Sequence, residues 1–240
     1  MIDIHLKKLR RRDDISPEEE RVIRNLVSHT TQFGADKVVI RAGEALNQSL
    51  ILLRGWAARA KDLPSGQRQF AELHVPGDFA DLHSFTLKRL DHDVVTITPC
   101  VFAIVPHEPL KEITEGFPHL TRVYWFATNL DAAIHREWAL SLGRRSAISR
   151  MAHLFCELLV RLEVVGLTSG DSYDFPLTQV ELAECLGLTS VHVNRTLQEM
   201  RKMGLVEVEN RRIDILDLEA LKGVAEFDDS YLYLDKRSNR

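Results

Sequence analysis

The chain has 240 residues, 45% of them hydrophobic, and a formal net charge of −4. This length is enough for one large domain or two modest ones with real hydrophobic cores. No apolar run approaches the length of a membrane span, and the N-terminal sequence MIDIHLKKLRRRDD carries charges where a secretion signal needs an apolar stretch. We therefore expect a cytoplasmic protein that does not contact the membrane.

The cysteines are few and far apart. Cys100, Cys156 and Cys185 are odd in number, and they fit neither a disulfide framework nor the ligand spacing of a metal site. We expect them to pack in the core, and we predict no bound metal.

Residues 1 to 33 are predicted to be helical. Ser16 and Pro17, followed by three glutamates, form a strong helix start, with a capping serine, a proline in the first turn and acids at the positive end of the helix dipole. The basic run from Lys7 to Arg12 is interpreted as a solvated helix face rather than a nucleic-acid patch.

From Asp36 the pattern changes to short strand-like runs. The runs are 37–40, 50–53, 57–60, 69–73 and 94–105. The turns between them hold glycine or proline, as in Pro76-Gly77-Asp78. Regular turn signals between short β segments predict a small antiparallel barrel or roll. A roll of this kind can enclose a small-molecule ligand.

A long helix is predicted from Phe117-Pro118 to Leu142. Apolar residues recur along it at alternating spacings of three and four, namely Leu120, Val123, Ala127, Leu130 and Ile134. We favour a coiled-coil seam between two subunits, and the alternative is that this face packs on the roll within one chain. Gly143 is predicted to end the helix and to mark a domain boundary.

After a further helix to about Val165 and a turn-rich connector from Leu167 to Pro176, two short helices around a tight turn are predicted. Thr178 with Glu181 is a capping box that opens the first helix. Gly187 can take the left-handed conformation that ends it, and Thr189 can cap the second. The first helix is expected to bury Val180, Leu182, Ala183 and Leu186.

The outer face of the second helix carries hydrogen-bonding side chains. They are Ser190, His192, Asn194, Arg195, Gln198 and Lys202. Short or forked polar groups near a helix N-terminus are suited to reading base edges and holding phosphates in the major groove of DNA. The alternative is an ordinary helical hairpin with a solvated polar face.

The segment that follows favours DNA binding. Residues 205–208 and 212–216 are predicted to pair as strands, with Arg211 and Arg212 at or near the tip, where a wing contacts the phosphate backbone. Acidic residues outnumber basic ones over residues 144–240, so we expect modest nonspecific affinity with a steep salt dependence.

The order of these parts resembles the Crp/Fnr family of bacterial transcription regulators over nearly the whole chain. Three segments look like the glycine turns of the family's sensor roll: Ile40-Arg-Ala-Gly43-Glu44, Leu53-Arg-Gly55 and Pro76-Gly77-Asp78-Phe79. Three others look like its helix-turn-helix: Leu177-Thr178-Gln179 through Ala183, Leu186-Gly187 and Val193-Asn194-Arg195-Thr196-Leu197.

The resemblance implies an α+β fold in three parts. Residues 1–116 are expected to form an N-terminal helical segment and an antiparallel β roll (a double-stranded β-helix) like a cyclic-nucleotide-binding domain. Residues 117–143 are expected to form the dimerisation helix and hinge, and residues 144–240 a winged helix-turn-helix. The implied function is that of a homodimeric transcription regulator that binds a near-palindromic site in double-stranded DNA and senses a small-molecule effector through the roll.

By the same resemblance, Arg195 matches the recognition-helix arginine that contacts guanine or phosphate. The full set expected to contact DNA is Thr178, Thr189, Ser190, Val191, His192, Asn194, Arg195, Gln198, Lys202, Arg211 and Arg212. Many family members have an acid where this chain has Val191, so the usual half-site of the family is not assumed.

The effector is not identified by the resemblance. The candidate pocket residues are Asp81, His83, Lys88 and Arg89. Leu90 and Asp91 fall where cyclic-AMP-binding members have a phosphate-binding pair, and a carboxylate repels an anion, so cyclic AMP is not expected, although Lys88 and Arg89 could supply the charge in another loop register. Histidines at 74, 83 and 92 could converge on a metal, but their spacing says little.

Some members of the family sense their signal through an iron-sulfur cluster or through haem, and this sequence supports neither cofactor. An iron-sulfur sensor is excluded because it needs an N-terminal cysteine cluster and the first cysteine is Cys100. Carbon-monoxide sensors carry a cysteine and then a histidine here, and only His83 matches while Asp81 replaces the cysteine, so haem is not favoured.

No motif indicates an enzyme, since the chain lacks a glycine-rich phosphate loop, a nucleophile elbow and metal-ligand spacing. A small-molecule-binding or protein-interaction module that kept the fold without DNA binding is the alternative function. If the protein activates transcription, RNA polymerase is a further partner.

Overall fold

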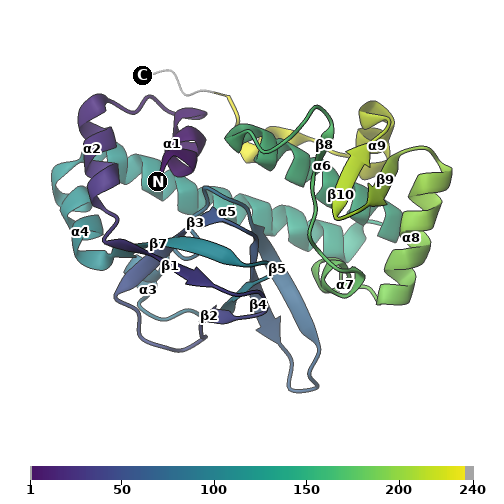
Figure 1. Ribbon diagram of the computed structural model, residues 1–240, viewed down its shortest axis with the longest axis horizontal. Helices are drawn as coiled ribbons and strands as arrows, with labels where there is room; N and C mark the ends of the chain where they lie inside the picture. Colours follow the sequence, from purple (N-terminus) through teal and green to yellow (C-terminus); the bar gives the residue numbers. More distant parts are fainter. Residues whose placement is uncertain (1, 236–240) are drawn as a thin grey trace.

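The computed structural model describes residues 2–235, which form a β roll, a long helix and a smaller C-terminal domain (Figure 1). The long helix, α5 (Pro118–Arg144), runs along the molecule from the side of α4 (His107–Gly116) to the side of the C-terminal domain. None of the helices in the described part of the chain is long and apolar enough to cross a membrane.

The N-terminal segment is helical only as far as Asn25. It forms α1 (Asp3–Arg10) and α2 (Pro17–Asn25), and the capping box of Ser16 and Glu19 is present at the start of α2. The prediction of helix to residue 33 was wrong, because β1 (His29–Phe33) pairs antiparallel with β7 (Cys100–Pro106). Residues 29–33 form a strand because their pairing partner β7 lies far along the chain, and local propensity does not indicate such a partner.

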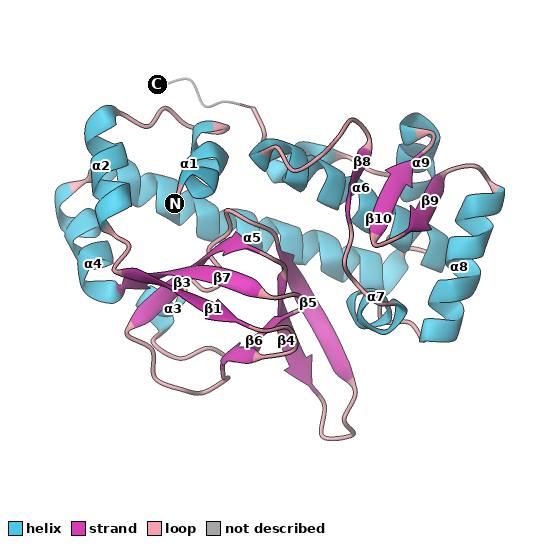
Figure 2. Ribbon diagram, viewed as in Figure 1, coloured by secondary structure: helices cyan, strands magenta, loops and turns pink. Residues whose placement is uncertain are grey.

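The roll consists of two antiparallel sheets, shown in magenta in Figure 2. One has the order β1-β7-β3 and the other the order β2-β6-β4-β5. The remaining strands are β2 (Val38–Ile40), β3 (Gln48–Arg54), β4 (Ala57–Asp62), β5 (Arg68–His74) and β6 (Asp93–Thr96), with the short helix α3 (Ser84–Leu87) between β5 and β6. The predicted run 94–105 is therefore two strands, β6 and β7.

The long helix ends at Arg144, two residues later than the predicted Leu142. Gly143 lies within α5, which continues to Arg144, and Ser146 caps α6 (Ala147–Val165). The connector contains a strand, β8 (Ser172–Asp174), that the sequence did not indicate. The other elements are α7 (Gln179–Leu186), α8 (Ser190–Lys202), β9 (Val206–Glu209), β10 (Arg212–Ile215), α9 (Leu218–Ala225) and the 3-10 turn η1 (Asp229–Leu232).

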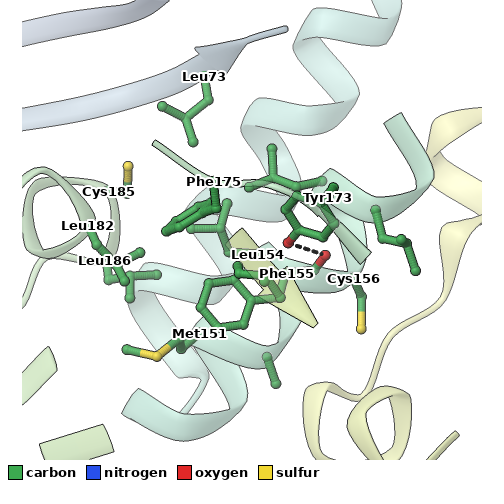
Figure 3. Packing of buried hydrophobic residues seen from close by; sticks show 14 of the residues in the cluster. Leu73, Met151, Leu154, Phe155, Cys156, Tyr173, Phe175, Leu182, Cys185 and Leu186 are labelled. Carbon is green, nitrogen blue, oxygen red and sulfur yellow. Dashed lines mark hydrogen bonds between the residues drawn. The ribbon is translucent and has the colours of Figure 1, made fainter. Parts of the chain in front are cut away.

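A single hydrophobic cluster joins the roll to the C-terminal domain. It combines Leu73 of β5 with the buried side of α6 and with α7 (Figure 3). The Tyr173 hydroxyl is also buried there and donates to the Phe155 carbonyl at 3.0 Å, so its polar atom is satisfied. The prediction that all three cysteines are buried and free is confirmed.

A buried ion network lies beside this cluster. The Arg161 guanidinium of α6 donates to the Leu73 carbonyl at 2.6 Å and to Asp78 Oδ2 at 2.9 Å on the roll, and to Glu157 Oε1 at 3.0 Å on its own helix. Burial disfavours the charge on Arg161, but Asp78 and Glu157 outweigh burial and raise its pKa. Glu157 also accepts from the Trp138 indole and from the Tyr231 hydroxyl. The network therefore links the roll, α5, α6 and the C-terminal tail.

The basic run near the N-terminus contributes to the same interface, so its interpretation as a solvated face was only partly right. Lys8 forms an ion pair with Asp78. The Arg12 side chain is buried and donates from Nε and from a terminal nitrogen to the Leu232 carbonyl, at 3.2 and 3.1 Å. These contacts bind the tail to the N-terminal segment.

Replacing Arg161 with methionine is expected to destabilise the protein by about 3–5 kcal/mol, because Glu157 would stay buried without an ion-pair partner and Asp78 would keep only Lys8. Urea denaturation of both proteins at pH 7 measures the difference. The matched control is Arg68→Met, which breaks a part-exposed pair with Asp62 and should cost less than about 1 kcal/mol. Equal losses in the two variants would contradict the role assigned to Arg161.

Candidate nucleic-acid interface and sensor cavity

The two helices α7 and α8 meet at a turn that local capping groups define. Thr178 Oγ1 accepts from the Glu181 amide at 3.2 Å, and Glu181 accepts in return from the Thr178 amide at 2.7 Å, which confirms the capping box. Leu182, Ala183 and Leu186 are buried as predicted. Val180 is not, since 59% of it is exposed on the outer side of the first turn.

Gly187 ends α7 in the left-handed conformation, with φ +60°, and Thr189 caps α8 by accepting from the His192 amide at 3.3 Å. A Cβ at Gly187 would lie 3.1 Å from Leu142 Cδ2, so the turn closely approaches the end of α5. Arg150 also fixes this turn relative to α5, because its guanidinium donates to the carbonyls of Leu186, Leu142 and Arg145. The orientation of α7 and α8 is thus tied to the end of the long helix.

The two faces of α8 differ in burial. Val193, Thr196 and Met200 are buried in the domain core. The opposite face exposes Val191, Arg195, Gln198 and Lys202 at helical spacing. Figure 1 shows α8 at the edge of the molecule, away from the sheets of the roll. We call these four exposed residues the reading stripe.

The polar groups beside the reading stripe form a short chain of amides. Gln198 donates to Asn194 Oδ1 at 3.0 Å, and Asn194 donates to Gln179 Oε1 of α7 at 3.4 Å. Arg195 has no hydrogen-bond or ion-pair partner within residues 2–235. An exposed guanidinium without a partner can donate up to five hydrogen bonds to an external acceptor.

The predicted wing is present. β9 and β10 pair antiparallel around a two-residue turn, Asn210-Arg211, in which both residues have positive φ. This is the geometry of a tight hairpin. Arg212 donates to Asp214 Oδ1 at 2.9 Å, and Arg211 lines a cleft of ≈ 510 Å³ between the wing tip and the roll. Arg212 is therefore paired within the wing, whereas Arg211 faces the cleft.

The residues predicted as a dimer seam point into their own chain. Leu120, Val123, Leu130 and Ile134 are buried, and Ala127 is half-buried. The seam prediction was wrong for these five side chains, because the apolar face of α5 packs within its own chain, in one half against α1, α2, α4 and the roll and in the other half against α6 and the roll. An exposed stripe lies on the other face of α5 with the same three-and-four spacing, and it consists of Arg122, Trp125, Asn129, Ala132, Arg136 and Ala139.

A cavity of ≈ 280 Å³ lies between the roll and α5. Only His83 of the four predicted pocket residues lines it. Asp81 is buried elsewhere, accepting from the Leu50 amide and from the Ser84 hydroxyl, and burial raises its pKa to about 6. Lys88 lies over the Phe85 ring, and Arg89 donates to the Gly43 carbonyl. These three residues make contacts within the roll and do not line this cavity.

The cavity is lined mainly by charged and imidazole side chains that the sequence did not bring together. They are Arg59, Lys61, His83, Asp91, His92, Asp131 and His135. Burial lowers the pKa of His83 to about 3 and also lowers the pKa values of His92 and His135. These imidazoles are neutral at pH 7, and neutral imidazole can both donate and accept hydrogen bonds.

Arg59 is the buried cation of the cavity. Its guanidinium donates to Glu72 Oε2 at 2.6 Å and to Asp131 Oδ2 at 2.8 Å. Burial opposes the charge on Asp131, but Arg59 outweighs burial and lowers its pKa, whereas burial raises the pKa of Glu72 to about 8. Asp91 lies at the cavity and is paired with Lys61 at 2.8 Å. The cavity can offer both donors and acceptors to a polar ligand.

No metal-binding cluster of three or more His, Cys, Asp or Glu side chains occurs within the described range 2–235. The three histidines considered as metal ligands do not all converge, since His83 and His92 line the cavity with ring centroids 5.4 Å apart but His74 does not line it.

Comparison with known proteins matches both halves of the chain. Residues 30–116 match the cyclic nucleotide-binding domain, and residues 149–224 match the Crp-like helix-turn-helix domain. A probable transcriptional activator of Rhizobium leguminosarum is 33% identical over 175 residues, covering 71% of this chain and 70% of that protein. The transcriptional activator protein FnrL of Cereibacter sphaeroides is 27% identical over 199 residues, covering 81% and 79%.

The fold is shared with solved structures. The structure of FixK2 from Bradyrhizobium japonicum superposes with a TM-score of 0.76 at 22% identity, covering 83% of this chain and 98% of that one. The order of roll, long helix and helix-turn-helix is therefore the same in both.

Gly187→Ala is expected to destabilise the protein by about 1–2 kcal/mol, because a residue with a Cβ is strained in the left-handed conformation. Gly143→Ala is the matched control. Gly143 is helical and a Cβ there would meet nothing within 4 Å, so this change should stabilise by up to about 1 kcal/mol. Thermal denaturation of both variants measures the two signs, and a stabilised Gly187 variant would contradict the turn geometry.

Proposed function

The chain belongs to the Crp/Fnr family of transcription regulators, and we propose that it acts as a homodimer whose two α8 helices read the half-sites of a near-palindromic operator in double-stranded DNA. The observation that carries this proposal is the reading stripe, with its unpartnered Arg195 on an exposed face fixed by the caps at Thr178 and Thr189. Such a helix fits the major groove, with its N-terminal residues at the base edges.

In this proposal the residues expected to contact DNA have different roles. Ser190, Val191, His192 and Arg195 meet base edges, while Lys202, Arg211 and Arg212 meet phosphates. Thr178, Thr189 and Asn194 lie at the helix starts or in the amide chain and position the reading stripe, and Gln198 belongs to the stripe itself. Bacterial DNA lies in the cytoplasm, so the protein is expected to act there. If it activates transcription, RNA polymerase is its next partner.

The dimer would form along the exposed stripe of α5. Trp125 is 67% exposed there, which is unusual for the largest side chain, and Ala132 and Ala139 let two helices approach closely. A three-and-four spacing is the pattern of a two-stranded coiled coil. Two α5 helices in contact would carry two recognition helices on one side of the assembly, about one helical turn of DNA apart.

The cavity beneath α5 is the place for an effector. A polar molecule bound by Arg59 and His83 of the roll and by Asp131 and His135 of α5 would change how the roll packs on that helix. It would shift the protein toward the arrangement that binds the molecule better. A module of the same fold without DNA binding is the alternative, and it predicts no salt-dependent binding to duplex DNA.

Arg195→Ala is expected to weaken binding to the best duplex by about 1–3 kcal/mol and to relax the preference at one position of each half-site. Lys202→Ala is the contrast, since loss of a phosphate contact should weaken binding to all sequences by a similar factor. Fluorescence anisotropy with duplexes selected by the unmodified protein measures both. Unchanged affinity in the Arg195 variant would remove this residue from the interface.

Trp125→Glu is expected to convert the dimer to a monomer, because two carboxylates would face each other across the seam. Sedimentation equilibrium measures the mass. Leu87→Glu, at an exposed leucine of the roll, should leave the mass unchanged. A Trp125 variant that remains dimeric would place the seam elsewhere.

A further inference from the structure

One apolar side chain stands on the otherwise polar reading stripe. Val191 is the second residue of α8, and 79% of it is exposed. A β-branched residue there adds little to helix stability, and an exposed one buries no surface in the fold. Its neighbours along the stripe are Arg195, Gln198 and Lys202, all of which carry hydrogen-bonding groups. The stability of the folded chain therefore gives no reason for a valine at position 191.

The position of Val191 relative to Arg195 is set by the helix. Residues four apart lie on the same face, and a rise of ~1.5 Å per residue separates them by about 6 Å along the axis. Base pairs in duplex DNA are stacked ~3.4 Å apart. Because a recognition helix follows the major groove and is inclined to the axis of the duplex, a helix that aims Arg195 at one base pair brings Val191 to a base at most about two steps away. The Thr189 cap fixes the backbone at this turn, because its hydroxyl accepts from the His192 amide.

The chemistry of the major groove offers one good partner for valine. Guanine, cytosine and adenine present donors and acceptors there, and thymine alone presents a C5-methyl group. Valine beside the polar edge of another base would remove water from a donor or acceptor without replacing the hydrogen bond. Valine against the thymine methyl buries apolar surface on both sides.

We propose that Val191 is a specificity-determining residue that selects thymine by contact with its C5-methyl group, at a position within about two base pairs of the base read by Arg195. The operator then has this thymine once in each half-site. This inference rests on the proposed function and names the sequence feature that the same surface recognises.

The first experiment removes only the methyl group. Duplexes selected by the unmodified protein are remade with deoxyuridine in place of each thymine in turn, and the dissociation constants are compared. At one symmetric position the unmodified protein should bind about four-fold more weakly, since a buried carbon contributes about 0.8 kcal/mol. Val191→Ala should show a smaller loss at that position, because alanine lacks the two γ-methyl groups with which valine covers the thymine methyl.

The second experiment changes the preference. A glutamate accepts a hydrogen bond from the cytosine amino group, so Val191→Glu should replace thymine by cytosine at that position and leave the other positions unchanged. Met203→Glu is the control for added charge, because Met203 is exposed just beyond the C-terminal end of α8, away from the base-reading residues. It should lower affinity without altering the selected bases.

The outcomes separate the two claims. If the unmodified protein retains no duplex from a random pool, with or without the small molecules of a bacterial extract, the proposed function fails and this inference with it. If a symmetric motif is retained but Val191→Glu still selects thymine, the proposed function stands and the role of Val191 is overturned. A deoxyuridine penalty equal in the Val191→Ala variant overturns it as well.

Discussion

The arrangement of the molecule depends on a buried arginine between two carboxylates. Arg161 joins Asp78 of the roll to Glu157 of α6, and its guanidinium also donates to the Leu73 carbonyl. Each of these charged groups is buried, so each is tolerable only while the others are in place. The position of α6, and with it that of the two helices packed on it, is therefore set relative to the turn Pro76-Gly77-Asp78 of the roll. The roll and the helices that carry the reading stripe are therefore joined by buried contacts.

That coupling gives a physical route from the cavity to DNA. The cavity is bounded by α5, and the end of α5 holds the turn between α7 and α8 through Leu142 and Arg150. A change in the packing of α5 on the roll would be felt at Gly187, where a single added carbon has no free space. The ion network and the close-packed turn would transmit a shift rather than absorb it, because packed interiors have few intermediate arrangements.

The parts that the sequence predicted well are those determined by local chemistry. The caps at Thr178 and Thr189, the left-handed glycine at 187 and the short hairpin around Asn210 are each specified within a few residues, and all are present. The strand β1 could not be predicted, because its partner β7 lies far along the chain. The Arg161–Asp78 pair is likewise separated by 83 residues, and nothing in either neighbourhood indicates the other.

The same difference between local and long-range contacts explains which site residues could be predicted from the sequence. Helical periodicity alone places Arg195, Gln198 and Lys202 of the reading stripe on the outer face of α8, whereas Val191 was expected at the DNA only from the family resemblance. The cavity depends on which sides of the roll and α5 meet, so the prediction missed Arg59, Asp131 and His135. An arginine within the small-residue strand Ala57-Ala-Arg59-Ala was the one available signal. The spacing of three and four on α5 correctly identified an apolar face, but that face was assigned to a second subunit, and in the structure it belongs to the core of its own chain.

The central claim is that two reading stripes engage one duplex, and hydroxyl-radical footprinting on a duplex retained by the purified protein tests it most directly. The account predicts two protected segments of the backbone, related by two-fold symmetry and centred about one helical turn apart. A single protected segment, or no duplex retained at moderate salt even with the small molecules of a bacterial extract present, would contradict it.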